Sequence, residues 1–236
     1  MIFPLRDLVI IPVFDEEQTL PSVLEALFKV YSDTVLLVDD GSTDRGVERA
    51  QAVFPGRFEV IRHEKNRGYG ASLITGFQYS LENGYERVVT MDCDWQHQPS
   101  LVPSFFKSLS KADIVSGSRY MQDVNGSAPK DRKAINHFVS GMIQEETGLY
   151  LTDSFCGFKA YRREVLEQFQ LSEEGYAIPL QMWAQVAHFG FSVLELSVPL
   201  IYLDPSRSFG GKLDDPEFRK AHYISTWNEE RVRWAA

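Results

Sequence analysis

The sequence predicts a single α/β domain whose mostly parallel β-sheet is flanked by helices on both faces. Three observations support this fold class. Short runs rich in Val, Ile and Leu alternate with helix-like segments through the first part of the chain. These runs are almost entirely apolar, which is typical of parallel strands buried on both faces. Acidic residues follow several of them, at the strand ends where open parallel sheets bind ligands.

The first part of the chain supplies most of the predicted sheet. Its predicted strands are residues 8–14, 34–38, 58–62 and 87–91. The predicted helices between them are residues 19–31, 47–53 and 68–83. The first of these helices places apolar side chains at helical spacing, with Pro21 in a first turn that tolerates proline. The third helix opens with a glycine-rich turn.

The alternation weakens after Ser100, but further elements follow. The predicted strands are residues 113–118, 155–161 and 192–198. The predicted helices are residues 133–147, 163–169, 178–189 and a charged amphipathic segment, 216–234. Because no linker interrupts the chain, we predict one domain over residues 1–213, with residues 214–236 as a helix packed on it or extending from it.

The bulk properties exclude several classes of protein. A net charge of −9 over 236 residues argues against a nucleic-acid partner held on a broad basic face. Cys93 and Cys156 lack zinc-site spacing and fit a reducing compartment. The start of the chain lacks the layout of a signal peptide, and no apolar run approaches the roughly 20 residues of a membrane span. We therefore expect a cytoplasmic protein that contacts a membrane peripherally at most.

Asp92 and Asp94 carry the most specific local signal. They follow the predicted strand 87–91, and residues i and i+2 of an extended segment point the same way. Two carboxylates that close repel each other unless a proton or a cation lies between them. Oxygen ligands on a polar loop suit Mg²⁺ or Mn²⁺, commonly completed by substrate phosphates. A solvated surface turn is the alternative for an isolated pair, but here acidic pairs also follow two other strands.

Seven ordered segments resemble family 2 glycosyltransferases of the GT-A fold. Within that family, the resemblance is to the branch of dolichol-phosphate mannose synthases and polyprenyl-phosphate sugar transferases. The matching segments are residues 11–16, 39–44, 66–70, 92–97, 116–120, 153–159 and 207–213. Each segment alone is weakly specific, but the ordered set extends over residues 8–213. The resemblance implies a Rossmann-like GT-A domain, a nucleoside-diphosphate sugar donor, Mg²⁺ or Mn²⁺, and an inverting transfer.

The resemblance also implies which residues bind the donor. Those assigned to the base and ribose are Pro12, Phe14, Glu16, Asp39 and Asp40. Uracil and guanine both present N–H groups that an aspartate can accept, so a UDP-sugar and a GDP-sugar are both open. Gly68 either only opens a helix or allows the backbone to approach the diphosphate closely.

Metal and diphosphate contacts follow from the same resemblance. Asp92 would face the ribose and the metal, while Asp94 and Gln96 would ligate the ion that bridges the diphosphate. Arg207 and Lys212 match a loop that closes over the donor diphosphate. A divalent ion and cationic side chains would together stabilise the negative charge that the leaving diphosphate gains.

The acceptor decides which further residues the chemistry requires. Arg119 and Arg132 match positions that meet the acceptor phosphate in the polyprenyl-phosphate branch. A phosphate monoester has a second pKa of about 6, so it can attack with little proton transfer. A soluble or protein hydroxyl acceptor would need a general base, for which Asp153 is the best candidate.

Departures from the family pattern keep alternatives open. Asp15 stands where the family often has Asn, Lys159 where it often has Arg, and residues 210–213 lack the serine of the family motif. The alternatives are transfer to a soluble or protein hydroxyl, and a nucleotide-sugar-binding subunit without turnover. Acidic residues balance the basic ones of the tail helix, which favours packing or a homodimer contact over a membrane surface.

Overall fold

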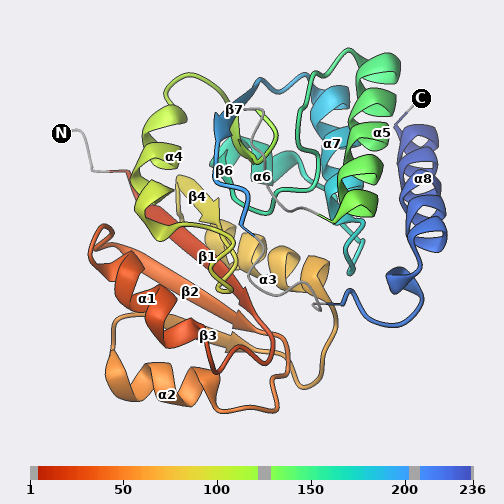
Figure 1. Ribbon diagram of the computed structural model, residues 1–236. Helices are drawn as coiled ribbons and strands as arrows, with labels where there is room; N and C mark the ends of the chain where they lie inside the picture. The colour runs from red at the N-terminus through yellow and green to blue at the C-terminus, as the bar shows by residue number, and fades with distance from the viewer. Residues whose placement is uncertain (1–4, 122–128, 202–207, 235–236) are drawn as a thin grey trace.

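A seven-stranded sheet runs through the computed structural model, which describes residues 5–121, 129–201 and 208–234 (Figure 1). The strands are β1 (Asp7–Val13), β2 (Thr34–Asp39), β3 (Glu59–Arg62), β4 (Arg87–Thr90), β5 (Ile114–Ser118), β6 (Lys159–Arg162) and β7 (Val193–Ser197). Their order across the sheet is β3-β2-β1-β4-β6-β5-β7. Strand β6 is antiparallel to β4 and β5, and the remaining neighbours are parallel. The predicted mostly parallel sheet is therefore confirmed.

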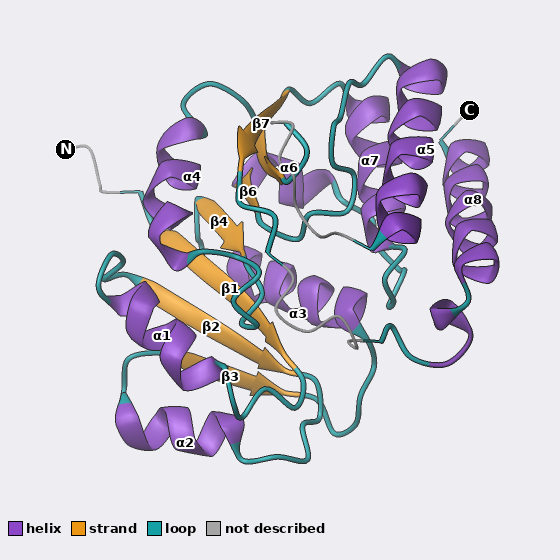
Figure 2. Cartoon of the chain, in the orientation of Figure 1, coloured by secondary structure: helices purple, strands orange, loops and turns teal. Residues whose placement is uncertain are grey.

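Helices cover both faces of this sheet (Figure 2). One face carries α1 (Leu20–Phe28), α2 (Gly46–Val53) and α4 (Val102–Ser108), the last preceded by the short helix η1 (Pro99–Leu101). The other carries α3 (Tyr69–Glu82), α5 (Lys130–Thr147), α6 (Arg163–Gln168), α7 (Ile178–Phe189) and α8 (Pro216–Arg233), which follows η2 (Gly211–Asp214). Successive residues of β1 alternate between the two apolar cores: Leu8 packs on the α3 side and Val9 on the α1 side.

Two elements differ from the sequence prediction. Helix α4 is not predicted, because it is short, carries Pro103 in its first turn and follows Pro99, so it shows little helical periodicity. The predicted strand over residues 155–161 pairs as β6 only from Lys159 onward. The preceding residues form a loop over the ends of β4 and β5, where the Thr90 hydroxyl donates to the Gly157 carbonyl (2.8 Å).

Helix α8 packs against α5 and α7 and contributes to the apolar core. Trp227 is fully buried and donates from Nε1 to Glu146 of α5 (2.8 Å). Glu230 is also buried and accepts hydrogen bonds from Gln181 and Gln185 of α7. Within the described residues, no helix has the length and apolar character that a membrane span requires.

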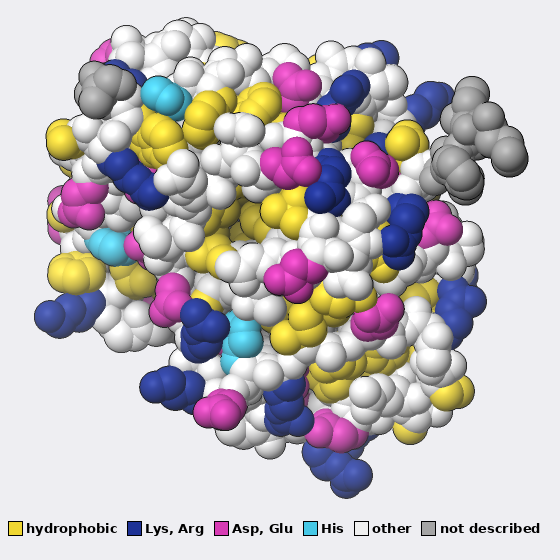
Figure 3. Space-filling model, turned by 180° about the vertical axis from the view of Figure 1, so that it is seen from behind, with side chains coloured by type: hydrophobic (Ala, Val, Ile, Leu, Met, Phe, Trp, Pro, Cys, Tyr) yellow, Lys and Arg dark blue, Asp and Glu magenta, His cyan; other side chains and the backbone are white. Residues whose placement is uncertain are grey.

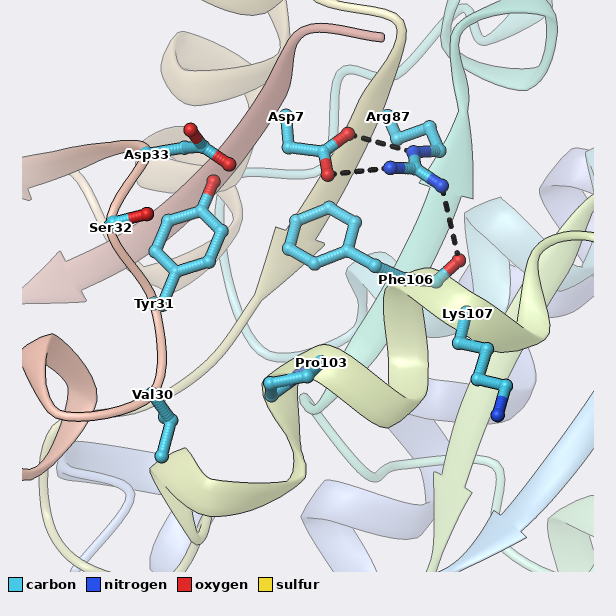
Figure 4. A pocket seen from close by; sticks show the side chains of 9 residues that line it. All are labelled: Asp7, Val30, Tyr31, Ser32, Asp33, Arg87, Pro103, Phe106 and Lys107. Atoms are coloured by element: carbon cyan, nitrogen blue, oxygen red, sulfur yellow. Dashed lines mark hydrogen bonds and ion pairs between the residues drawn. The ribbon is translucent and has the colours of Figure 1, made fainter. Parts of the chain in front are cut away.

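The amino ends of β1 and β4 hold a charged pocket of about 330 Å³ (Figure 4). Arg87 of β4 donates two hydrogen bonds to Asp7 of β1 (2.7 and 2.6 Å). Beside this pair, Tyr31 stacks on Phe106 with ring centroids 5.6 Å apart. These contacts tie the amino ends of two central strands together.

Over the back of the molecule, basic side chains are interspersed with acidic ones rather than gathered in one area (Figure 3).

Candidate active site

The carboxyl ends of β1, β2, β3 and β4 lie at one edge of the sheet, here called the rim (Figure 1). Backbone hydrogen bonds continue the strand pairing one residue further. The Asp40 N–H donates to the Val13 carbonyl (2.8 Å), and the His63 N–H donates to the Asp39 carbonyl (2.9 Å). The first residues of the rim loops are therefore held in the register of the sheet.

The loop after β1 is bound to the loop after β2. Asp15 has a left-handed backbone conformation, with φ at 53°. Its carboxylate accepts the N–H groups of Thr43 and Asp44 (2.7 and 3.2 Å), and its own N–H donates to the Ser42 hydroxyl. An aspartate at this position therefore joins two rim loops.

Three predicted nucleoside contacts lie on the β1 side of the rim. Pro12 belongs to the end of β1, and the half-buried Glu16 accepts the Thr19 hydroxyl (2.6 Å). Phe14 is 44% exposed. An exposed aromatic ring at a ligand-binding edge offers a flat apolar surface against which a base can stack.

One oxygen of the Asp39 carboxylate, beneath the rim, has an ion-pair contact but no hydrogen bond from the described residues. The Asp39 side chain is 1% exposed, and its Oδ1 accepts the Ser42 N–H (2.8 Å). Arg62 Nε lies 3.2 Å from Oδ2, but Oδ2 receives no hydrogen bond from the described residues. A buried acceptor without a donor is unfavourable, and an N–H group of a bound base would satisfy it.

Asp40 is engaged differently from its neighbour. Its Oδ1 accepts from His63 Nδ1 (2.7 Å) and from the Arg67 N–H (2.9 Å), and its Oδ2 accepts the Gly68 N–H (2.8 Å). These three donors all come from the chain itself. The predicted nucleoside contact at Asp40 therefore has a structural task as well, which is to hold the loop over residues 64–68.

The glycines before α3 have a packing reason in the structure. A Cβ atom on Gly68, which has φ at 114°, would lie 2.3 Å from the Glu174 carbonyl oxygen. On Gly70 it would lie 2.2 Å from that of Glu173. The Ala71 N–H donates to the Glu174 carbonyl (3.0 Å). The segment 173–175 thus covers the start of α3, and a diphosphate contact at Gly68 stays a prediction.

Asp92 lies beside two side chains that keep it in place. Its N–H donates to Nδ1 of His97 (2.9 Å), and the Tyr69 hydroxyl hydrogen-bonds to its carboxylate. Burial lowers the pKa of His97 to about 3, against the opposing charge of Asp94. Burial, and next the Asp92 carboxylate, raise the pKa of Tyr69 well above its ordinary value. His97 is therefore a neutral packing residue whose Nδ1 lone pair is already used.

Asp94 and Gln96 are bonded to each other. Gln96 donates from its backbone N–H to Asp94 Oδ1 (3.0 Å) and from Nε2 to Oδ2 (2.7 Å). The described residues contain no group of three or more His, Cys, Asp or Glu side chains arranged to hold a metal. The Asp92 side chain is 32% exposed and Asp94 is 9% exposed. Two carboxylates and an amide suit a hard ion whose shell is completed by substrate oxygens.

Arg119 and Asp153 form a largely buried ion pair at the end of β5. Arg119 donates from Nε to Asp153 Oδ2 (2.6 Å), from Nη2 to Oδ1 (2.9 Å) and from its backbone N–H to Oδ2 (3.1 Å). Asp153 is fully buried. Burial alone would raise its pKa, but the Arg119 charge and hydrogen bonds outweigh burial and lower the pKa. A carboxylate held in this way is a poor proton acceptor.

Lys159 lies beneath the same end of the rim. It is 3% exposed, and its Nζ donates to the Cys156 carbonyl and lies 5.3 Å from the centre of the Trp183 ring. Burial lowers its pKa. Lys159 therefore adds a buried basic group close to the Arg119 and Asp153 pair without reaching the surface.

Of the remaining predicted cations, Arg132 lies beside Phe209, where Arg219 of α8 also lies. Arg132 and Arg219 lie 4.5 and 4.6 Å from the centre of the Phe209 ring. Phe209 meets Tyr176 edge-on (5.3 Å), and Tyr176 stacks on Tyr69 (5.8 Å). Lys212 is exposed in η2, 5.7 Å from the Phe218 ring, and Arg207 lies outside the described residues. Aromatic contacts thus connect the Arg132 region to Tyr69 and Asp92.

Three residues of this site are not singled out by sequence reasoning. Tyr69 hydrogen-bonds to Asp92, and His63 hydrogen-bonds to Asp40. Glu195 of β7 accepts hydrogen bonds from the N–H groups of Thr152 and Asp153. Tyr69 lies inside a recognised motif, which is a signal that could have found it. His63 and Glu195 lie outside the motifs, and only the tertiary structure places His63 beside Asp40 and Glu195 beside Thr152 and Asp153.

Comparisons with known proteins agree on the kind of domain. Residues 8–169 match the model of the family described as glycosyl transferase family 2. The chain is 33% identical over 218 residues to the undecaprenyl-phosphate mannosyltransferase of Micrococcus luteus, covering 88% of this chain and 89% of that protein. It is 30% identical over 243 residues to the polyprenol monophosphomannose synthase of Mycolicibacterium smegmatis, covering 97% and 90%.

A solved structure shares the fold at lower identity. Glucosyl-3-phosphoglycerate synthase from Mycobacterium tuberculosis, in complex with Mn²⁺ and UDP-glucose, superposes with a TM-score of 0.76. The match covers 96% of this chain and 79% of that chain at 18% identity. At this identity the likeness concerns the fold alone.

Proposed function

We propose that this chain, which belongs to glycosyl transferase family 2, moves a sugar from a nucleoside-diphosphate sugar to a polyprenyl phosphate with inversion at the anomeric carbon. One observation carries the proposal. The relatives named undecaprenyl-phosphate mannosyltransferase and polyprenol monophosphomannose synthase each match at least 88% of this chain, over at least 89% of their own length. The donor class is supported further by the UDP-glucose bound in a protein of the same fold.

The donor nucleoside would lie between the β1 and β2 loops. Phe14 would stack against the base, and the Oδ2 atom of Asp39 would accept a base N–H. Uracil and guanine both carry such an N–H group, so the base is not decided by this contact. Pro12 and Glu16 would line the same side.

Asp92 and Asp94 would hold Mg²⁺ or Mn²⁺, with Gln96 exchanging its N–H contact to Asp94 for an oxygen contact to the ion. A bound divalent ion acts as a Lewis acid that offsets the charge on a leaving diphosphate. Lys212 and Arg207 would add positive charge from the C-terminal loop. Removing one well-placed group of this kind costs on the order of 2.7–4 kcal/mol of barrier.

Arg119 and Arg132 would orient the acceptor phosphate. A phosphate is already ionised near neutral pH, so the reaction needs no strong base at this point. Asp153 is a weak base, because its pKa is lowered and both its oxygens accept from Arg119, and a phosphate acceptor does not require a stronger one. A hydroxyl acceptor would need a base with a pKa near the working pH, so the geometry favours the phosphate acceptor.

The paired variant Arg119→Gln with Asp153→Asn tests the acceptor assignment. The two amides replace the ion pair by neutral polar groups, so no buried charge is left unpaired and the fold should survive, whereas Arg119→Ala alone would leave the buried Asp153 charge unpaired. We expect transfer to a polyprenyl phosphate to fall by about 100–1,000-fold, with nucleotide binding retained. Transfer assays with radiolabelled UDP- and GDP-sugars, and calorimetry with the matching diphosphates and Mn²⁺, measure both quantities.

The single variant Asp153→Asn is the control that separates the acceptors. Because it keeps Arg119 together with an amide oxygen that can still accept from it, and because the Arg119 side chain is partly exposed, transfer to the lipid phosphate should stay within about tenfold of wild type. Loss of transfer to a hydroxyl acceptor in Asp153→Asn, with no lipid phosphate used by the wild type, would support the alternative enzyme. Nucleotide binding without any metal-dependent transfer would support a non-catalytic subunit.

A lipid acceptor implies that the protein reaches a membrane surface. We expect peripheral contact, through the side of the molecule that holds Arg119 and Arg132. Flotation with anionic vesicles that contain polyprenyl phosphate measures this contact. Equal recovery in the top fraction with and without vesicles would argue against it.

A further inference from the structure

A buried histidine without a part in the proposed chemistry lies behind the donor end of the rim. His63 is the first residue after β3, and its side chain is 6% exposed. Its Nδ1 lies 2.7 Å from Asp40 Oδ1, and its Nε2 lies 2.9 Å from Thr75 Oγ1 on α3. Because a carboxylate only accepts hydrogen bonds, His63 donates to Asp40. The imidazole therefore bridges the end of β2 and the helix α3.

Asp40 connects His63 to the backbone of residues 64–68 through hydrogen bonds. Its two oxygens accept the N–H groups of Arg67 and Gly68, the last residues before α3. Of these three donors to Asp40, His63 alone is a side chain, and its buried contact adds to the two backbone N–H groups in fixing the rotation of the carboxylate. Without it, the carboxylate could turn away from the two backbone groups.

The loop over residues 64–68 has few other strong supports. Residues 64–67 are exposed. The loop passes close over Gly41, where a Cβ atom would lie 2.6 Å from the Lys65 carbonyl carbon. The ion pair between Arg67 and Glu174 has side chains 46% and 50% exposed, and exposed pairs contribute little stability. The buried contacts of Asp40 therefore dominate the position of this loop.

We propose that His63 is a positioning residue: through Asp40 it orders the loop over residues 64–68 before the donor binds. The inference rests on the proposed function, because this loop carries Gly68, a predicted donor contact. If the loop is already ordered before the donor arrives, donor binding does not lose free energy in ordering it. The effect of His63 therefore falls on donor affinity rather than on the acceptor.

Two replacements of His63 separate its contacts. In His63→Asn, the amide nitrogen takes the place of Nδ1 and can still donate to Asp40. In His63→Ala, the donor is lost and the Asp40 carboxylate is free to rotate. Thr75→Val removes only the hydrogen bond at Nε2, on the side of the ring away from Asp40. Val139→Ala, in the buried face of α5, is a matched control that destabilises the core away from this loop.

Two measurements read the effect. Deuterium exchange of peptides over residues 63–70 should quicken in His63→Ala, stay close to wild type in His63→Asn and in Val139→Ala, and change little in Thr75→Val. Calorimetry with UDP or GDP and Mn²⁺ should show affinity about tenfold weaker in His63→Ala, and restored to within about threefold in His63→Asn. The KM for the acceptor should not move.

The outcomes separate this inference from the proposed function. Unchanged exchange over residues 63–70 in His63→Ala would overturn the positioning role, whatever the nucleotide result. Equal weakening of donor affinity in His63→Ala and Val139→Ala would also overturn it, because general destabilisation would then explain the loss. A wild type that binds neither nucleotide would refute the proposed function, while the exchange data would still decide the role of His63 in the loop.

Discussion

At the scale of single residues, neighbouring side chains of the same type have different tasks. Asp39 and Asp40 are adjacent and both are buried, and the sequence assigns both to the donor nucleoside. In the structure Asp39 keeps one oxygen without a hydrogen-bond donor among the described residues, whereas Asp40 accepts three hydrogen bonds from the chain. Hydrogen-bond demand distinguishes a group that can receive a ligand from one that supports the site.

His97 provides a prediction about stability and pH. Its pKa is about 3 in the folded protein and 6.5 is its ordinary value, so between these limits the unfolded chain binds a proton that the folded chain does not. Stability must then fall as the pH falls. From about pH 7 to about pH 5, this one group should remove about 2 kcal/mol from the free energy of unfolding.

His97→Asn removes this titration and keeps an acceptor for the Asp92 N–H. Urea denaturation of both proteins at several pH values measures the difference. The wild type should lose about 2 kcal/mol more than His97→Asn over this range. Parallel pH profiles for the two proteins would show that His97 is not the group responsible.

At the scale of elements, the start of α3 is shaped by a segment distant in sequence. Residues 173–175 lie so close to Gly68 and Gly70 that neither position has room for a side chain. The same contact satisfies one N–H group in the first turn of the helix, since Ala71 donates to Glu174. Packing within the chain therefore accounts for a glycine pattern that resembles a phosphate-binding turn.

Gly70→Ala tests this explanation against a matched glycine. The new Cβ would overlap a backbone oxygen at 2.2 Å, so the segment 173–175 must move, and we expect a loss of about 1–3 kcal/mol in the free energy of unfolding. Gly141→Ala in α5 meets nothing within 4 Å and should gain about 0.5–1 kcal/mol from helix propensity. Thermal and urea unfolding compare the two, and equal effects of the same sign would contradict the packing account.

At the scale of the whole molecule, the two ends of the sheet differ in role. The carboxyl ends carry the candidate site, and the amino ends of β1 and β4 are joined by Asp7 and Arg87 (Figure 4). The length of the strands separates these ends, with Asp7 at the start of β1 and Val13 at its end. Changes at one end should therefore affect stability, and changes at the other should affect ligand binding.

Arg87→Ala and Asp94→Asn test this division. Arg87→Ala leaves Asp7, whose side chain is 10% exposed, without its partner, and should cost about 1–3 kcal/mol of stability with unchanged nucleotide affinity. Asp94→Asn removes one charge from the candidate metal pair and should weaken Mn²⁺-dependent nucleotide binding by roughly tenfold or more. Nucleotide affinity that falls equally in both variants would contradict the division.

Much of the fold could be predicted because a short stretch of sequence is enough to show that a strand is buried. The nearly all-apolar runs at β1 and β2 predict parallel strands, and the ordered motifs predict the family and its polyprenyl-phosphate branch, which the matched family and relatives confirm. Helix α4 was missed because its prolines conceal its periodicity. The antiparallel direction of β6 was not predicted, because strand direction depends on neighbours distant in sequence.

The sequence by itself determined the α/β class, the order of the rim loops and the types of side chain on them, because these follow from short-range patterns of apolar and acidic residues. Only the tertiary structure decided the partners of those side chains. It placed His63 on Asp40, Arg119 on Asp153 and Tyr69 near Asp92. Such contacts join residues from different elements, and their geometry arises from sheet register and packing, which no local stretch of sequence contains.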